Sequence, residues 1–357
     1  MLLKIHAPDI HRESELIHET MQRVLVCITK TERFQHISFS GTSRVHKRYT
    51  GNRSDSHINK YIEACCKALH NEKRTFQLSH KADRKFIKKD SGFRFSIHRN
   101  KQVPTYIKEL MVETYYNVFA DRGFRFKDIK PEVINRLWFI NKIKEVNKQL
   151  QCCPYCGEAL KFPRDRNSGN VTLDHFFPES KYPTLSVALW NLIPVCSDCN
   201  SKYKQALDPL ENQNGVAEIQ NLCLPYEDPL ADDLELVFQC DATGTGSDGV
   251  TVKAKPGVPA LIQKKIANYV RFTKLNNKWS FELTKIREML VVMLPAMIRR
   301  YNWTGPADII NYMNEQSQPE HVREEMNYEP YKLLTAAYYQ WLVNQPHRIQ
   351  EFWDACK

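Results

Sequence analysis

The sequence predicts an α+β protein: mostly helical regions flank a small module of short strands, and a β-hairpin follows it. Apolar residues recur every three or four positions at 131–150, the spacing of a helix with one buried face. Two cysteine pairs between 153 and 199 enclose short strand-like runs. Two further strand-like runs flank the turn-rich connector 242–249, which favours a hairpin.

A chain of 357 residues can bury enough apolar surface for two or three domains. We expect an N-terminal basic, mainly helical region over 1–148, a motif-bearing module over 149–210, and a C-terminal region over 211–357. The predicted helices span 57–68, 103–119, 131–150, 264–272, 281–301, 306–315 and 328–344, and the predicted strands span 171–174, 191–195, 234–240 and 250–255.

The formal net charge of +10 favours attraction to a polyanion, of which nucleic acid is the commonest. Lysines and arginines are densest at 73–101, where Phe86, Phe93 and Phe95 are interleaved with them. Such a stretch can follow a phosphate backbone and stack on bases. A solvated helix face or loop with its aromatic residues buried beneath explains the same pattern.

The cysteine count points to a reducing compartment. Eleven cysteines cannot all pair internally, and residues 1–12 lack the apolar core of a secretion signal. The longest apolar-rich stretch, 289–298, is too short to span a bilayer. We therefore expect a cytoplasmic protein whose clustered cysteines bind metal instead of forming disulfides.

Cys153-Pro-Tyr-Cys156 and Cys196-Ser-Asp-Cys199 form two C-x-x-C pairs separated by 39 residues. Four thiolates suit a tetrahedral Zn²⁺ ion with no open position, which makes the ion structural and not catalytic. A single C-x-x-C pair can also be a redox pair, but two pairs flanking a compact polar segment favour zinc. Cys152 is adjacent to Cys153 and is an alternative ligand.

Polar residues lie between and after these cysteines. The alternating run 171–174 predicts a strand that ends at Asp174 and His175, and 191–195 predicts a second strand beginning at Asn191. Neighbouring strand residues point to opposite sides, so Asp174 and His175 need a bend or bulge to act together. A helix beginning near Cys199, with Asp198 as its possible N-cap, would carry Asn200 and Lys204 on one face.

This chemistry suits phosphodiester hydrolysis. His175 can act as general base near neutral pH. Asp174 and Asn200 offer hard oxygen ligands for a catalytic Mg²⁺ or Mn²⁺ ion. Lys204 is expected to hold a substrate phosphate, with Lys202, Tyr203 and Arg164 as weaker candidates for backbone contacts, and Glu179 is expected to be a solvated turn residue more than a metal ligand.

The run D-H-x-x-P, then N-L-x-x-x-C-x-x-C-N-x-x-K, with an upstream C-x-x-C, resembles the HNH (ββα-metal) endonuclease superfamily. The likeness is to the variant in which asparagine replaces the last histidine, and it covers about sixty residues. The resemblance implies a metal-dependent endonuclease that leaves 5′-phosphate and 3′-hydroxyl ends. It also implies that Asn191 orients His175 by hydrogen bonding.

Two other interpretations stay open. A non-catalytic zinc ribbon that binds nucleic acid or protein would need no Asp-His pair beside an asparagine. The segments 227–230 and 274–277 are loosely similar to HNH nucleases of bacterial anti-phage systems of the Septu-like class, which act beside an ABC-type ATPase. That similarity would make an ATPase subunit a partner. The sequence favours DNA over RNA as substrate without deciding between them.

Overall fold

The computed structural model describes residues 5–10, 12–17, 21, 105–124, 133–163, 169–216, 222–224, 226, 229–239 and 249–356. The predicted helix 57–68, the basic stretch 73–101, the connector 242–248 and Arg164 lie outside these residues.

Helices precede the motif-bearing module, as predicted. The helix α5 (Thr105–Glu113) continues directly into a π-helical segment, η3 (Thr114–Arg122). At the change of geometry, the Thr114 hydroxyl donates a hydrogen bond of 2.7 Å to the carbonyl oxygen of Leu110. The helix α6 (Arg136–Val146) is shorter than the predicted 131–150: Asn135 caps its start, accepting a hydrogen bond from the Trp138 amide, and Asn147 is the cap at its end.

The module contains an antiparallel pair of strands, β1 (Val171–His175) and β2 (Leu192–Cys196), which confirms the two predicted strands to within a residue. Two single-turn 3₁₀ helices, η4 (Pro183–Leu185) and η5 (Leu189–Asn191), connect the strands. The π-helical segment η6 (Cys199–Lys204) follows β2. The order strand, strand, helix is therefore the predicted one.

A second antiparallel pair, β3 (Leu234–Gln239) and β4 (Gly249–Ala254), forms the predicted hairpin after the short helix η8 (Ala231–Asp233). The helices α7 (Ala260–Thr273) and α8 (Leu275–Tyr301) are separated only by Lys274, whose φ of 51° breaks the helix. The remaining helices are α9 (Pro306–Gln316), α10 (Pro319–Glu325), α11 (Lys332–Val343) and α12 (Pro346–Cys356).

Two of these helices, α10 and α12, are absent from the sequence prediction. Each begins with a proline in its first turn, a position where the missing amide hydrogen is not needed. The helix α10 has only seven residues, too few for a clear apolar period. In α12, Ile349 and Trp353 are buried four residues apart, so the apolar spacing of the sequence could have predicted this helix.

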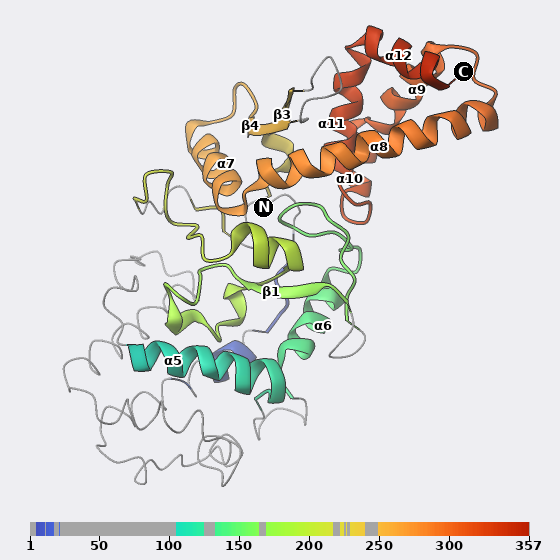
Figure 1. The fold of residues 1–357 in the computed structure, drawn as a ribbon. Helices are drawn as coiled ribbons and strands as arrows, with labels where there is room; N and C mark the ends of the chain where they lie inside the picture. Colours follow the sequence, from blue (N-terminus) through green and yellow to red (C-terminus); the bar gives the residue numbers. More distant parts are fainter. Residues whose placement is uncertain are drawn as a thin grey trace, which may run out of the picture.

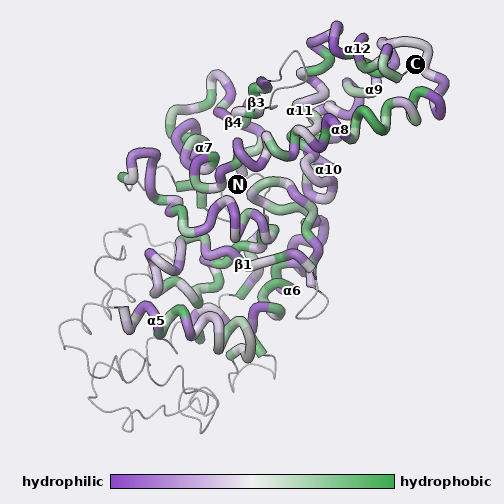
Figure 2. The backbone as a smooth tube through the Cα atoms, viewed as in Figure 1, coloured by the Kyte–Doolittle hydropathy of each residue, from purple (hydrophilic) through white to green (hydrophobic). Residues whose placement is uncertain are grey.

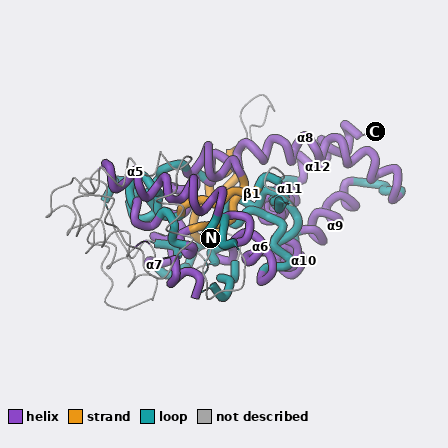
Figure 3. The backbone as a smooth tube through the Cα atoms, turned by 90° about the horizontal axis from the view of Figure 1, so that it is seen from below, coloured by secondary structure: helices purple, strands orange, loops and turns teal. Residues whose placement is uncertain are grey.

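The β1–β2 pair lies between α5 and the C-terminal helices, whereas β4 packs against α7 and α8 (Figures 1 and 3). Hydrophobic and hydrophilic residues alternate along α8 (Figure 2), and its apolar side contributes Trp279, Leu283 and Leu290 to the interior. One continuous cluster of buried residues reaches from Ile5 to Trp353, so all three expected regions contribute to the same core. Within the described part of the chain, no helix is long and apolar enough to cross a membrane.

Candidate active site

The four predicted cysteine ligands meet in the interior. The sulfur atoms of Cys153, Cys156, Cys196 and Cys199 lie within 4.8 Å of one another, and all four side chains are buried. Tetrahedral zinc with Zn–S bonds of about 2.3 Å requires S–S separations of about 3.8 Å. The Cys156 and Cys196 sulfurs are 3.8 Å apart. The donor set therefore fits one zinc ion with four sulfur ligands.

Backbone geometry shapes both C-x-x-C turns. The amide of Gly157 donates to the carbonyl oxygen of Cys153, and Gly157 has φ of +80°, which favours glycine. The amide of Cys199 lies 3.4 Å from the Cys196 sulfur, and that of Cys196 lies 3.4 Å from the Cys153 sulfur. Such amide donors stabilise thiolates. The turns are thus built to present sulfur to a cation.

Cys152 is not part of this cluster. Its backbone pairs with Ala159 in an isolated bridge, and its side chain is buried. Burial, which disfavours the charged form, raises the pKa of the Cys152 thiol to about 12. Cys153 is the residue that joins the other three sulfurs, which settles the choice left open by the sequence.

Asp174 is buried beneath the surface of the module. Both of its carboxylate oxygens are 3.1 Å from the ammonium nitrogen of Lys204, and the Tyr155 hydroxyl donates a hydrogen bond of 2.9 Å to Oδ2. Burial raises the pKa of Asp174, while Lys204 and Tyr155 act in the opposite direction. Lys204 therefore neutralises a carboxylate that would otherwise be costly to bury.

His175 follows at the end of β1. Its Nε2 lies 2.9 Å from the carbonyl oxygen of Ser186, and its ring packs edge-on against Tyr115 at 4.4 Å between centroids. A carbonyl oxygen only accepts, so Nε2 carries the hydrogen and Nδ1 of the neutral ring is an acceptor. Burial lowers the pKa of His175 to about 4, which keeps the ring neutral at pH 7.

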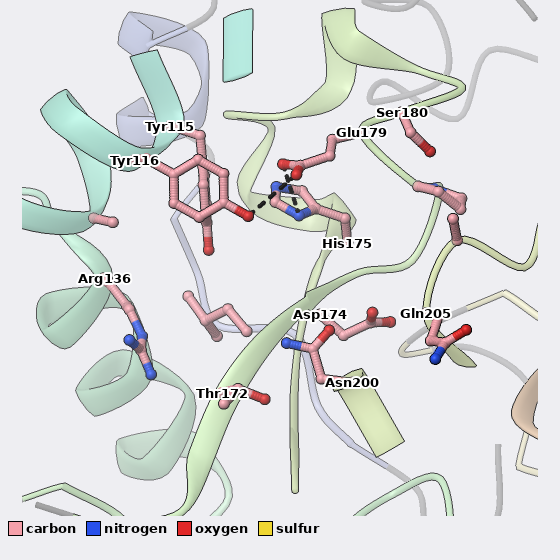
Figure 4. Close-up of a pocket in the computed structure, with 14 residues that line it drawn as sticks. Tyr115, Tyr116, Arg136, Thr172, Asp174, His175, Glu179, Ser180, Asn200 and Gln205 are labelled. Atoms are coloured by element: carbon pink, nitrogen blue, oxygen red, sulfur yellow. Dashed lines mark hydrogen bonds and ion pairs between the residues drawn. The ribbon is translucent and has the colours of Figure 1, made fainter. Parts of the chain in front are cut away.

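An open pocket of about 370 Å³ lies beside β1 (Figure 4). It brings together Asp174, His175 and Asn200, which the sequence had placed in one site. The register of β1 and β2 is uninterrupted across these residues, so the expected bulge is absent. Both neighbours still border the pocket because β1 pairs with β2 alone and its other edge is unpaired within the described sheet.

The pocket also contains residues that the sequence analysis missed or misplaced. Glu179 is not a solvated turn residue: Oε1 accepts a hydrogen bond of 3.1 Å from Tyr116, and Oε2 lies 3.5 Å from His175 Nδ1. Burial raises the pKa of Glu179. Arg136 lines the same pocket and donates a hydrogen bond of 3.0 Å to the Val171 carbonyl oxygen. These partners are 35 or more residues apart in sequence, so no local pattern marked them.

Asn191 makes different contacts from those expected. Its side-chain oxygen accepts from the Phe177 amide at 2.8 Å, and its nitrogen donates to the carbonyl oxygens of Phe177 and Leu185. The backbone of Ser186, and not Asn191, holds the His175 ring. Asn191 instead braces the loop between the strands, because a buried amide must satisfy its donors and acceptor where it lies.

The lysines also differ from the expectation. Lys204 is fully buried, and its ammonium donates to Asp174 and to the His175 carbonyl oxygen, so in this arrangement it does not face a substrate phosphate. Lys202 is exposed and pairs with Asp198 at 3.1 Å. Asp198 makes no side-chain capping hydrogen bond and forms ion pairs instead. Tyr203 is half-buried, and the Lys278 ammonium lies 5.3 Å from the centroid of its ring.

Comparison with known proteins gives a narrow result. No family model and no solved structure matches this chain. A stretch of 76 residues, 21% of the chain, is 33% identical to "Protein ea31" of Escherichia phage lambda. The chain spans about a fifth of the length of that phage protein, so the similarity concerns a segment and not the whole protein.

Proposed function

We propose that this chain is a metal-dependent endonuclease of the HNH (ββα-metal) type that hydrolyses phosphodiester bonds in nucleic acid. The observation that carries the proposal is the meeting of His175, Asp174 and Asn200 in one open pocket on a strand–strand–helix unit. Four clustered cysteines close the same unit. A purely structural zinc ribbon has no need for an imidazole and a carboxylate at a shared opening.

His175 is the proposed general base. Its Nε2–H is committed to Ser186, which fixes the ring and leaves Nδ1 to accept a proton from water. Glu179 Oε2 is a buried atom without a hydrogen-bond partner, 3.5 Å from Nδ1. A carboxylate at that place stabilises the imidazolium that forms when Nδ1 takes the proton.

Asp174 and Asn200 supply the oxygen ligands proposed for a divalent ion. Carboxylate and amide oxygens suit Mg²⁺ or Mn²⁺. When bound, such an ion neutralises charge on the phosphoryl group. Lys204 pairs with Asp174 in the interior and favours its ionised form, against the effect of burial, which raises the pKa of Asp174. We assign to Arg136 the phosphate-binding role first given to Lys204, because Arg136 lines the pocket while Lys204 is fully buried.

Three finer assignments are also part of the proposal. DNA as substrate and action with an ATPase in anti-phage defence rest on the sequence resemblance, and a cytoplasmic location rests on the cysteine count and the N-terminal residues. The name of the phage lambda protein states no activity, so the similarity adds nothing to these points.

Cleavage of supercoiled plasmid tests the proposal. We expect the zinc-loaded chain to nick plasmid DNA with Mg²⁺ or Mn²⁺ and to stop when these ions are removed while zinc is retained. Single-stranded DNA and RNA, assayed in parallel, decide the substrate class. Absence of cleavage of all three substrates with either ion, by a folded zinc-loaded protein, would exclude the nuclease and leave a binding module.

The dependence of the cleavage rate on pH below neutrality gives a second test. Because burial lowers the pKa of His175 to about 4, its base form should persist well below the usual histidine value of about 6.5. We expect the cleavage rate to stay level from about pH 8 to about pH 5.5, with zinc content measured at each pH. A rate that halves near pH 6.5 would contradict this protonation state.

The same shift predicts a stability change of defined sign. A lowered pKa in the folded state means that protonation favours unfolding. The stabilising contribution of neutral His175 is complete above the unfolded value of about 6.5 and declines as the pH falls toward 4.

A further inference from the structure

Tyr155 connects the cysteine cluster to the pocket. It is the second of the two residues between Cys153 and Cys156, and it is fully buried. Its hydroxyl donates a hydrogen bond of 2.9 Å to Asp174 Oδ2, across 19 residues of sequence. The turn that supplies two of the four sulfurs therefore also supplies a hydrogen bond to the carboxylate proposed as a metal ligand.

The Tyr155 ring has little freedom to move. It packs edge-on against Tyr269 at 6.4 Å and against Phe272 at 6.1 Å between ring centroids, both from α7. The Tyr269 hydroxyl also donates a hydrogen bond of 2.7 Å to the Tyr155 carbonyl oxygen. The aromatic packing and the turn together fix the place of the Tyr155 hydroxyl.

The carboxylate it contacts depends on this partner. Asp174 is 2% exposed, so water replaces a lost hydrogen bond poorly. Without the hydroxyl, Oδ2 keeps only the Lys204 ammonium, so one of the two side chains that fix the orientation of the carboxylate is lost. Groups that hydrogen-bond a metal-ligating carboxylate typically change metal affinity by roughly 10- to 100-fold.

We propose that Tyr155 is a positioning residue: it orients Asp174 for the divalent ion and so couples the four-cysteine cluster to the pocket. This inference rests on the proposed function, in which Asp174 is a ligand. It assigns to the C-x-x-C turn a role in the pocket besides holding zinc. It also identifies α7 as the support for that turn.

The test compares two tyrosine-to-phenylalanine variants of the full-length, zinc-loaded chain. Tyr155→Phe removes the hydrogen bond to Asp174. Tyr182→Phe is the matched control: Tyr182 is also buried, and its hydroxyl donates a hydrogen bond of 2.8 Å to the buried carboxylate of Asp208, outside the residues that line the pocket. Free Mn²⁺ is measured by electron paramagnetic resonance, and Asp174→Asn defines the Mn²⁺ binding that depends on this carboxylate.

We expect Tyr155→Phe to weaken Asp174-dependent Mn²⁺ binding by about 10-fold or more. Tyr182→Phe should change it by less than about 2-fold, because sites without shared partners act independently, and both variants should keep one zinc. Unchanged affinity in Tyr155→Phe, an equal loss in both variants, or Mn²⁺ binding indifferent to Asp174→Asn would each overturn the inference.

The experiments distinguish failure of the nuclease proposal from failure of the positioning role of Tyr155. Mn²⁺ binding that is sensitive to Tyr155→Phe in a chain that cuts no nucleic acid would support the positioning role and exclude the nuclease. Mn²⁺-dependent cleavage together with Mn²⁺ binding unchanged by Tyr155→Phe would retain the nuclease and exclude the positioning role.

Discussion

His175→Ala is expected to reduce nucleic-acid cleavage by about 100- to 10,000-fold, the range typical for loss of a general base. The expectation follows from the fixed tautomer: Ser186 holds Nε2, and only Nδ1 can accept a proton. Zinc content should be unchanged, because His175 is not one of the four clustered sulfur ligands. Plasmid nicking rates and metal analysis on the same preparation measure both quantities.

The matched control is His321→Ala. His321 is an exposed histidine of α10, outside the residues that line the pocket. Its removal should leave the cleavage rate within about 2-fold of wild type, since surface substitutions have small effects. Thermal unfolding of both variants separates lost chemistry from lost folding. Equal residual cleavage by folded His175→Ala and His321→Ala would end the assignment of His175 as base.

Cys156→Ser is expected to abolish zinc binding and to unfold the central module. Binding of a structural zinc supplies roughly 10–16 kcal/mol, while whole domains are stable by only about 5–15 kcal/mol. The cluster ties three segments together: the Cys153–Cys156 turn, the end of β2 and the start of η6. Loss of one ligand should therefore release all three.

Cys223→Ser is the control for that variant. Cys223 is equally buried but lies outside the four-sulfur cluster. We expect it to keep one zinc per chain and to lose only about 1–2 kcal/mol of stability. Elemental analysis and the midpoint of thermal unfolding are the measurements. A Cys156→Ser protein with full zinc content and an unchanged midpoint would show that the cluster does not hold the ion that stabilises the fold.

The sequence was informative where the chemistry is local. The C-x-x-C spacing identified the cysteines that meet, because two sulfurs three residues apart can reach one ion with little strain. Alternation over 171–174 located β1, since a strand with one buried side requires a period of two. The turn-rich connector located the β3–β4 hairpin for the same reason of local geometry.

The burial of Lys204 could not be predicted from the local sequence. A lysine after a zinc-binding turn is ordinarily exposed, and the sequence placed it on substrate. Its burial follows from Asp174, 30 residues earlier, whose carboxylate needs a cation in the interior. The environment of Glu179 depends likewise on Tyr116, a partner 63 residues away.

By itself, the sequence determined the α+β class, three of the four clustered sulfurs (Cys156, Cys196 and Cys199), and the order of the two strands and the helix that carry Asp174, His175 and Asn200. These features depend on spacings within a turn, a strand or a helix. Only the tertiary structure decided which partners hold each side chain: Ser186 for His175, Lys204 and Tyr155 for Asp174, and Arg136 for the pocket. The reason is physical, because a buried polar group is satisfied by whatever folding brings within hydrogen-bond distance.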